Sequence, residues 1–285
     1  MPAPPRASCG CLLSRRDVLH AGAVGALGIA GGLAFAGRGA AAVRGRAAAA
    51  AWEYEGPAGP DHWASLDPAY AGCATGRSQS PIALGRAHKG HVPELKLHYR
   101  PSKLKVQNLA DKHTIEIEVE GDNFITINDR RFDLIQFHFH HPSEHTIKRH
   151  RGALECHIVH QTTREVPPKQ GTAVLGILID PGRPGRAEKR PIYHDVIANA
   201  PRQPGATPVD LHREYNPATL LPRNPERYHY WGSLTIPACT EGVEWNVFSH
   251  RIVLPTSLIN AYAALYPHSN RPLQPLNGRP VSIGG

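Results

Sequence analysis

Hydrophobic and polar residues alternate in short stretches between residues 95 and 254, and turn residues separate these stretches. One such turn is Glu120-Gly121-Asp122-Asn123. Alternation with a period of two is typical of a strand with one buried face, so the pattern predicts a mainly β protein with a large, mostly antiparallel sheet. The predicted strands are Leu95–Tyr99, Lys103–Gln107, Thr114–Val119, Phe124–Ile127, Leu134–His141, Leu154–Gln161, Ala173–Ile179 and Val243–Leu254.

Two segments are helix candidates instead. Ile192–Ala200 and Ser257–Leu265 predict short helices, the second with Ser257 as its N-cap and Pro267 just beyond its end. The first lies within Pro181–Pro208, which is rich in Pro, Gly and Arg and which we interpret as a surface excursion. Because no repeat or long linker interrupts residues 52–285, we expect them to form a single domain.

The composition is that of an ordinary globular protein. Of 285 residues, 41% are hydrophobic and 20% are charged, which excludes a wholly disordered, collagen-like or coiled-coil chain. The net charge is +8, but six Arg and one Asp within residues 1–51 account for +5 of it. The remaining +3 forms no basic stripe interleaved with aromatic residues, so we expect no binding to nucleic acid.

The first 51 residues have the parts of an export signal. Ser14-Arg15-Arg16-Asp17-Val18-Leu19 precedes an uncharged run from His20 to Gly37, and small residues follow. The paired arginines resemble a twin-arginine signal, which exports folded proteins. This predicts a periplasmic or secreted protein without stable membrane association once the leader is removed. The alternative is a retained N-terminal anchor helix, for which the run is short and rich in glycine.

Cysteine usage agrees with export. Cys9 and Cys11 belong to the leader, whereas Cys73 and Cys239 each lie among turn residues and Cys156 lies in an apolar strand. In an oxidising compartment we expect a Cys73–Cys239 disulfide, with Cys156 buried and reduced. The alternative is three unpaired thiols.

Histidines form the most distinctive cluster in the chain. Seven of the 18 histidines lie between residues 138 and 160. On the predicted strand around them, Gln136, His138 and His140 share one face, because side chains alternate between faces. A catalytic zinc ion takes three protein ligands and keeps an open position, so this strand offers half of a zinc site. The alternative is a polar strand surface without metal.

The third ligand should come from the strand Leu154–Gln161, since opposed residues on neighbouring strands can share one ion. His157 and His160 are both candidates, but they face opposite sides. A zinc-bound imidazole usually donates its second N–H to an oxygen atom. Glu155 supplies such an oxygen on the face of His157, as Gln136 does for His138, so His157 is favoured.

At this point the chain resembles a known family. The motifs around the histidines and several segments elsewhere are similar to those of the α-class carbonic anhydrases, from about Trp52 to the C-terminus. The resemblance implies that family's fold, a large twisted, mostly antiparallel sheet with short peripheral helices. The matching segments are Gln136-Phe137-His138-Phe139-His140, Ser143-Glu144-His145-Thr146, Glu155-Cys156-His157-Ile158-Val159-His160, Gly232-Ser233-Leu234-Thr235, Trp52-Glu53-Tyr54-Glu55-Gly56-Pro57, Gln79-Ser80-Pro81-Ile82, Ala173-Val174-Leu175-Gly176-Ile177, Val243-Glu244-Trp245 and Arg271-Pro272-Leu273-Gln274-Pro275-Leu276.

By this resemblance, His138, His140 and His157 bind Zn²⁺. The ion would hold a water molecule whose pKa is about 7 in that family, and the resulting hydroxide would attack CO2 to give bicarbonate and a proton. The implied partner is therefore this small-molecule substrate, and a homodimer is left open.

The resemblance also implies roles for the residues around the metal. Thr235 would accept a hydrogen bond from the zinc-bound hydroxide and donate one to Glu144, because an ionised carboxylate can only accept. Gln136 and Glu155 would orient two of the ligands. An apolar wall would hold the uncharged CO2 and exclude water, and it would consist of Val159, Val174, Leu234, Val243 and Trp245.

The chain departs from the family pattern at the loop before His113, at Ile236, where a threonine is common, and at Ala238. His113 stands where the family often has its proton shuttle, a task suited to an imidazole. The preceding loop is two residues longer than usual, so the ring either serves as the shuttle or points elsewhere. Ala238 replaces a proline that usually follows a cis peptide bond in the family. Since a non-proline cis bond costs about 2.5–4 kcal/mol, we expect Pro237–Ala238 to be trans.

Other functions stay open on the same fold. A non-catalytic zinc-binding or adhesion module, a zinc-buffering protein and a secondary esterase activity are the alternatives to an exported carbonate dehydratase. The presence of all three histidines, with Glu144 and Thr235, argues for the enzyme.

Overall fold

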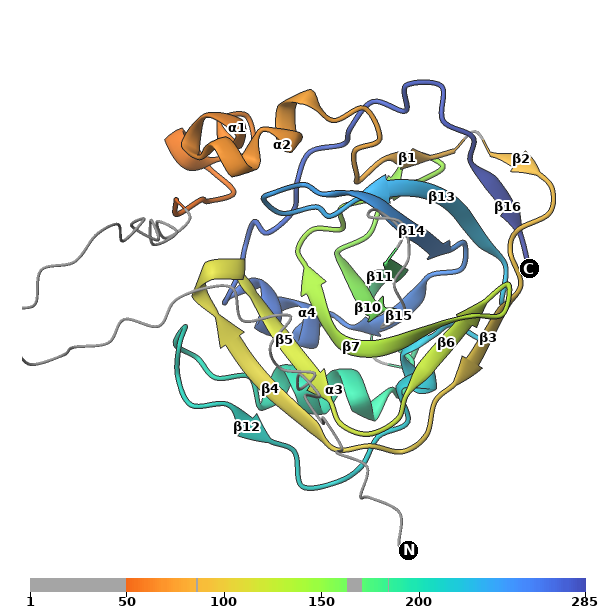
Figure 1. The fold of residues 1–285 in the computed structure, drawn as a ribbon. Coiled ribbons are helices and arrows are strands. Elements are labelled where there is room, and N and C mark those ends of the chain that lie inside the picture. The colour runs from red at the N-terminus through yellow and green to blue at the C-terminus, as the bar shows by residue number, and fades with distance from the viewer. Residues whose placement is uncertain (1–49, 86, 163–170, 184) are drawn as a thin grey trace, which may run out of the picture. The chain divides into compact units, whose positions relative to one another are not determined.

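A 13-stranded sheet dominates the described part of the chain (Figure 1). The computed structural model describes residues 50–85, 87–162, 171–183 and 185–285. The leader predicted over residues 1–51 lies outside these ranges except for its last two residues, so the export signal stays a prediction. No helix within the described ranges has the length and apolar character needed to span a lipid bilayer.

The strands near the middle of the sheet carry the predicted histidines. In spatial order the main run is β12 (Val209–Asp210), β4 (Leu104–Leu109), β5 (Thr114–Val119), β7 (Arg130–His140), β10 (Leu154–Gln161), β11 (Thr172–Gly182), β14 (Glu241–Phe248), β13 (Arg227–Ser233), β16 (Ser282–Gly284) and β2 (His88–Lys89). Off this run, β15 (Ile252–Pro255) pairs with β11, and β6 (Phe124–Ile127) lies between β3 (Leu95–His98) and β7. A smaller sheet contains β1 (Ala83–Leu84), β8 (Thr146–Ile147) and β9 (His150–Arg151).

The prediction of a mostly antiparallel sheet is confirmed. Among the described strands, parallel pairing is confined to β1–β8, β11–β14, β11–β15 and β16–β2. The predicted strand Val243–Leu254 is in fact two strands, because the chain bends at residues 249–251 between β14 and β15. Strand β13 was not predicted.

The helices are short and lie around the sheet. They are α1 (Trp63–Leu66), α2 (Gly72–Thr75), α3 (Pro191–Ala198) and α4 (Thr256–Ala263), with 3-10 turns η1 (Gly56–Ala58), η2 (Pro68–Tyr70), η3 (Ala110–Lys112) and η4 (Pro217–Leu220). The N-cap predicted at Ser257 is wrong, because α4 already begins at Thr256 and its N-cap, Pro255, has no side-chain capping bond.

The interpretation of Pro181–Pro208 as a surface excursion needs correction. Helix α3 lies within it and buries Ile192, Tyr193, Val196 and Ile197 against the main core. One side of the helix is therefore part of the core, while its other side, including His194, and most of the residues that flank it are exposed.

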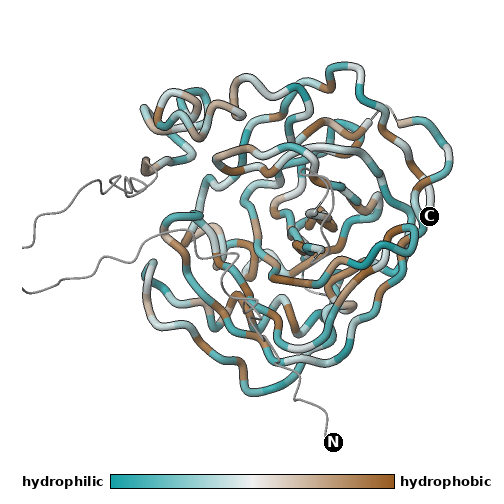
Figure 2. The backbone as a smooth tube through the Cα atoms, in the orientation of Figure 1, coloured by the Kyte–Doolittle hydropathy of each residue, from teal (hydrophilic) through white to brown (hydrophobic). Residues whose placement is uncertain are grey.

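The sheet separates two hydrophobic clusters. Hydrophilic and hydrophobic positions alternate along its strands (Figure 2). The larger cluster joins one face of β7, β10 and β11 to α3 and α4, and includes Phe137, Phe139 and Ile158. The smaller one includes Val174, Val243 and Trp245. Gln136, His138 and His140 alternate with the aromatic residues of the larger core, so they lie on the opposite face of β7.

The disulfide prediction is confirmed. Cys73 and Cys239 are bonded with their Cα atoms 5.0 Å apart, and Cys156 is a buried free thiol. The prediction of a trans bond before Ala238 is wrong, since Pro237–Ala238 is cis. That prediction weighed only the local peptide and left out the contacts that hold this loop, in which Cys239 is disulfide-bonded and its carbonyl accepts from Gln79 Nε2 at 3.1 Å.

Candidate metal centre

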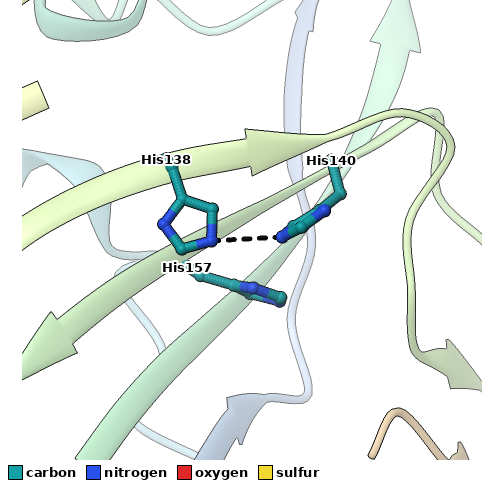
Figure 3. A group of neighbouring side chains, drawn as sticks. All are labelled: His138, His140 and His157. Carbon is teal, nitrogen blue, oxygen red and sulfur yellow. Dashed lines mark hydrogen bonds between the residues drawn. The ribbon is translucent and has the colours of Figure 1, made fainter. Parts of the chain in front are cut away.

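Three imidazoles from two neighbouring strands converge on one point (Figure 3). His138 and His140 lie two residues apart on β7, and His157 on β10 pairs with His138 in the antiparallel register. One ring nitrogen from each of the three lies within 4.8 Å of the others. The strand register thus brings together the three residues that the sequence favoured as ligands.

Hydrogen bonds to the opposite ring nitrogens identify which atoms are left as donors to a metal. Each ring has one nitrogen against an oxygen that accepts, and that nitrogen must carry the proton. The remaining nitrogens, two Nε2 atoms and one Nδ1 atom, keep their lone pairs toward the common point. The protonated nitrogens and their acceptors are His138 Nδ1 with Gln136 Oε1 at 2.8 Å, His140 Nδ1 with the Ser269 carbonyl at 2.5 Å, and His157 Nε2 with Glu155 Oε1 at 3.0 Å.

The chemistry and spacing of this donor set fit zinc. His138 Nε2 and His140 Nε2 lie 3.1 Å apart. Two nitrogens bound to one zinc ion at about 2.0–2.1 Å with a tetrahedral angle lie about 3.3–3.4 Å apart. Three imidazoles and no further side chain in the group leave the fourth corner of a tetrahedron for solvent or substrate.

Burial keeps these imidazoles neutral. Burial is the largest of the effects that lower the pKa of His157. Burial also lowers the pKa of His140 to about 4. The pKa of His138 falls well below its usual value because of burial and of the neighbouring His140 and His157. The lone pairs are therefore free at neutral pH, as metal binding requires.

The structure separates the two candidates on β10. A register shift between Val159 and His160 interrupts the pairing with β7. His160 is fully buried, and its Nε2 lies 2.6 Å from the hydroxyl of Tyr99, which packs against the larger core. His157 therefore lies in the metal group, and His160 faces the other side of the sheet.

Glu155 ties the metal group to a buried hydrogen-bond network. It accepts from the backbone amide of His145 at 2.8 Å and from its Nδ1 at 2.7 Å, while His145 Nε2 lies 2.6 Å from the Tyr230 hydroxyl. Burial opposes ionisation of Glu155, but its interactions with His145 and His157, which include a hydrogen bond to each, hold its pKa well below the usual range. His145, Glu155 and His157 also satisfy the spacing of a metal group, yet hydrogen bonds already join them to one another.

Glu144 lies beside the ligands. Its Oε2 is 3.7 Å from His140 Nε2 and 3.9 Å from His157 Nδ1, and it is buried without a hydrogen-bond partner. Its Oε1 accepts from the backbone amide of Arg271 at 2.8 Å. Burial raises the pKa of Glu144 to about 7, while His157, the Arg271 amide and the Thr235 hydroxyl oppose that rise. Because Oε2 has no hydrogen-bond partner and Oε1 accepts from the Arg271 amide, the Thr235–Glu144 hydrogen bond expected from the sequence stays a prediction.

The five predicted wall residues pack together in the smaller hydrophobic cluster. Trp245 places its ring 4.9 Å from that of His157 and 4.8 Å from that of His145, measured between centroids. The cluster thus covers one side of the metal group with apolar surface.

The opposite side is polar, and the sequence reading missed it. Glu116 on β5 pairs in register with His138 on β7 and is buried. Lys112 in η3 binds Glu116 Oε2 at 2.8 Å. Lys112 and Glu116 are four residues apart in the sequence and have opposite charges. This spacing could have indicated the ion pair from the sequence.

His113 lies at the edge of the polar side, immediately before β5. Its Nε2 is 2.8 Å from the Trp52 carbonyl, and its ring packs edge-on against Trp52 and Tyr54. Its side chain is 21% exposed, so it is accessible to solvent. The neighbouring Tyr54 has a buried hydroxyl without a hydrogen-bond partner, and burial, followed by the charge of Glu144, raises its pKa.

Comparisons with known proteins agree with this geometry. Residues 58–284 match the family model described as eukaryotic-type carbonic anhydrase. The carbonic anhydrase of Neisseria gonorrhoeae is 35% identical over 233 residues, which cover 81% of this chain and 86% of that protein. The solved structure of the α-carbonic anhydrase of Photobacterium profundum is similar with a TM-score of 0.72 and 34% identity, covering 81% of this chain and 99% of that one. That of Thermovibrio ammonificans, in complex with the inhibitor sulfanilamide, has a TM-score of 0.74 and 34% identity, covering 82% of this chain and 99% of that one.

Proposed function

The chain belongs to the α-carbonic anhydrases, a family of lyases, and on that premise we propose that it hydrates CO2 reversibly to bicarbonate and a proton with one Zn²⁺ ion per chain. One observation carries the proposal. His138, His140 and His157 direct three lone pairs at one point, and their other nitrogens are each held by an oxygen acceptor.

The protein's part is to hold three neutral ligands in a fixed orientation. When bound, zinc supplies a Lewis acid that makes a hydroxide nucleophile available near neutral pH. Gln136, the Ser269 carbonyl and Glu155 fix the three rings, and such partners are worth about 10–100-fold in metal affinity. Neutral imidazoles leave the full charge of the cation to act on its fourth ligand.

Thr235 and Glu144 would select the orientation of the nucleophile. Ionised Glu144 can only accept, so the Thr235 proton points to it and the Thr235 oxygen is left to accept a hydrogen bond from the nucleophile. A cation held by His140 and His157, each within 4 Å of Glu144 Oε2, would favour the ionised carboxylate. This arrangement aims a lone pair of the nucleophile at the substrate.

The apolar wall would bind CO2 beside the metal. Val159, Val174, Leu234, Val243 and Trp245 offer no hydrogen bond to a competing water molecule from their aliphatic and ring surfaces. CO2 carries no charge, so burial against this wall costs it little, whereas the charged product bicarbonate is released toward the polar side.

His113 would carry the proton from the metal centre to solvent. It is partly exposed, and it immediately precedes the strand β5 that pairs with β7. An imidazole has two ring nitrogens and is a side chain suited to proton transfer.

A stopped-flow assay of CO2 hydration tests this function. We expect hydration above the buffer rate, loss of it with a chelator or sulfanilamide, and recovery when Zn²⁺ is restored. The matched control is His140→Ala, which removes one ligand. Folded protein with one zinc per chain but no hydration would refute the enzyme, whereas several loosely bound ions would indicate a zinc buffer and no zinc an adhesion module.

We also propose that the protein is exported and works in the periplasm or outside the cell. The Cys73–Cys239 disulfide supports this, because such bonds persist in oxidising compartments. Replacing Arg15-Arg16 by Lys-Lys should retain the protein in the cytoplasm if the leader is a twin-arginine signal. Unchanged recovery from the exported fraction would remove that assignment.

A further inference from the structure

His113 is held in place by the N-terminal segment, with an acceptor at each ring nitrogen. The Trp52 carbonyl can only accept, so His113 Nε2 carries a proton and donates to it at 2.8 Å. The other nitrogen, Nδ1, lies 3.5 Å from Glu53 Oε2. A neutral ring therefore presents a lone pair to the carboxylate, and a protonated ring presents an N–H.

Glu53 is fixed at its backbone and exposed at its side chain. Its amide donates to the Ala58 carbonyl at 2.8 Å, and its carbonyl accepts from Trp63 Nε1 at 2.8 Å. Its carboxylate is 59% exposed. The backbone bonds set the position from which the carboxylate reaches His113, while solvent has access to both groups.

The charged pair nearest His113 on its own turn is matched within itself. The Lys112 ammonium binds Glu116 at 2.8 Å, so that pair carries no net charge toward the ring. Among the described residues, the ionisable side chains on the elements packed against His113 are Glu53, Tyr54 and Glu55 from the N-terminal segment, Asp111 and Lys112 from η3, and Glu116 and Glu118 from β5. Glu55 approaches His268, and Glu118 accepts from Gln107.

We propose that Glu53 is a positioning residue for proton release, which stabilises protonated His113 at the rim of the metal centre. The inference rests on the proposed CO2 hydration with His113 as carrier. A proton that arrives through solvent forms a bond to His113 Nδ1, and the new N–H donates to Glu53. When buffer takes the proton, that N–H bond breaks and its electron pair stays on Nδ1.

The test compares Glu53→Gln with Glu55→Gln, a matched control. Glu55 lies two residues further along, is 73% exposed, and approaches only His268 Nε2, at 4.0 Å, among the ion pairs of the described residues. Hydration is measured by stopped flow at low buffer concentration across pH, and kcat is separated from kcat/KM. In Glu53→Gln we expect the acid limb of kcat to move about 0.2–0.7 units to lower pH, the size of an exposed ion pair, while kcat/KM stays unchanged.

A second readout does not depend on activity. In ¹⁵N NMR spectra of the whole protein at mildly acidic pH, the Nδ1–H signal of His113 is assigned by its absence in His113→Ala. We expect this proton to exchange with solvent faster in Glu53→Gln than in wild type or Glu55→Gln.

The outcomes separate the inference from the function. If wild type hydrates CO2 and Glu53→Gln matches Glu55→Gln in both readouts, the role of Glu53 is overturned and the function stands. If no zinc-loaded variant hydrates CO2, the proposed function fails, and the exchange rates alone decide whether Glu53 holds the ring.

Discussion

His138 Nε2 and His140 Nε2 face each other 3.1 Å apart, although neither carries a proton when its ring is neutral. Two lone pairs at this distance repel each other unless a cation lies between them. Burial and the adjoining imidazoles lower the pKa of His138, so protonation of this ring does not relieve the repulsion at neutral pH. The folded chain thus brings together three imidazoles that could hold a metal ion.

Zinc should therefore bind at one ion per chain and stabilise the fold. At a free concentration 100 times the Kd, the free energy of unfolding should rise by about 2.7 kcal/mol. His140→Ala should abolish both the tight ion and the gain, measured by metal analysis and urea unfolding. His150→Ala is the control, since His150 is exposed and pairs with Asp180 at 2.8 Å. Retention of tight zinc by His140→Ala would contradict the assignment.

Glu155→Gln should weaken zinc binding by about 10–100-fold without removing a ligand. The glutamine oxygen can still accept from His157 Nε2, but it lacks the charge that polarises the ring, and the amide competes within the bonds to His145. Competition with a chromophoric chelator measures the change. Glu118→Gln on β5 is the control, because Glu118 is exposed and contacts Gln107. Equal affinities in the two variants would argue against a role for Glu155.

The alternation of residues along the chain was enough to predict much of this centre. Side-chain parity places Gln136, His138 and His140 on one face of β7, and Glu155 with His157 on one face of β10. Both strands occur within one residue of their predicted bounds at the C-terminal side. The alternation of side chains between the two faces depends only on the strand itself, so the folded sheet keeps it.

Contacts between distant segments were beyond local patterns. The acceptor for His140 is the carbonyl of Ser269, 129 residues away, and the amide that binds Glu144 belongs to Arg271. Every residue has a backbone carbonyl and almost every residue has a backbone amide, so the sequence does not indicate which of them will bind His140 or Glu144. These contacts become known only when the C-terminal segment is placed in the fold. The cis bond between Pro237 and Ala238 likewise has no signature in the local sequence.

Strand β13 was missed although its pattern is readable. Tyr228 and Tyr230 are buried and alternate with His229 and Trp231. All four side chains carry rings, so a classification into hydrophobic and polar residues does not show that they alternate. The alternation becomes clear only from which of them are buried. Its end matters to the site, because Thr235 follows it by two residues.

Glu144 should contribute to the pH dependence of the metal-free protein with a sign opposite to that of the three histidines, whose pKa values are lowered. Its pKa is raised from 4.5 to about 7, so the folded state binds more protons than the unfolded state in that range, and stability falls as pH rises through it. The pKa of His140 is lowered from 6.5 to about 4, and its contribution has the opposite sign, with stability rising with pH across that range. The two partly cancel between about pH 4.5 and 6.5.

In Glu144→Gln, the change of the free energy of unfolding with pH should therefore reflect the histidines without the opposing effect of Glu144. Without zinc, we expect the variant to gain stability over wild type as pH rises from 4.5 to 7, by up to about 3 kcal/mol. Urea unfolding at several pH values measures this, with Glu118→Gln as the exposed control. If the free energy of unfolding changes with pH in the same way in wild type and Glu144→Gln, then folding does not raise the pKa of Glu144, and the prediction is wrong.

The disulfide should contribute substantially to stability. Cys73 and Cys239 are 166 residues apart in sequence, and a long loop restricts the unfolded chain strongly. Reduction of the wild type should lower the free energy of unfolding by about 2–5 kcal/mol. The double variant Cys73→Ala/Cys239→Ala should start lower and show no response to reductant. A wild type that is indifferent to reductant, with both thiols shown to be free, would contradict this.

Thr235→Val should lower kcat/KM for CO2 while leaving the zinc content intact. Valine has nearly the same shape but can neither donate to Glu144 nor accept from the nucleophile, so a hydrogen bond with a charged partner is lost. Such a bond is worth about 1.5–3 kcal/mol, which corresponds to about a 10–150-fold loss. Thr235→Ser keeps the hydroxyl and should retain most of the activity, which separates hydrogen bonding from packing at this buried position. Since Thr235 is not a ligand, metal analysis should give equal zinc in all three proteins. If valine and serine reduce kcat/KM equally, the methyl group would be what matters, and Thr235 would be part of the wall that shapes the pocket.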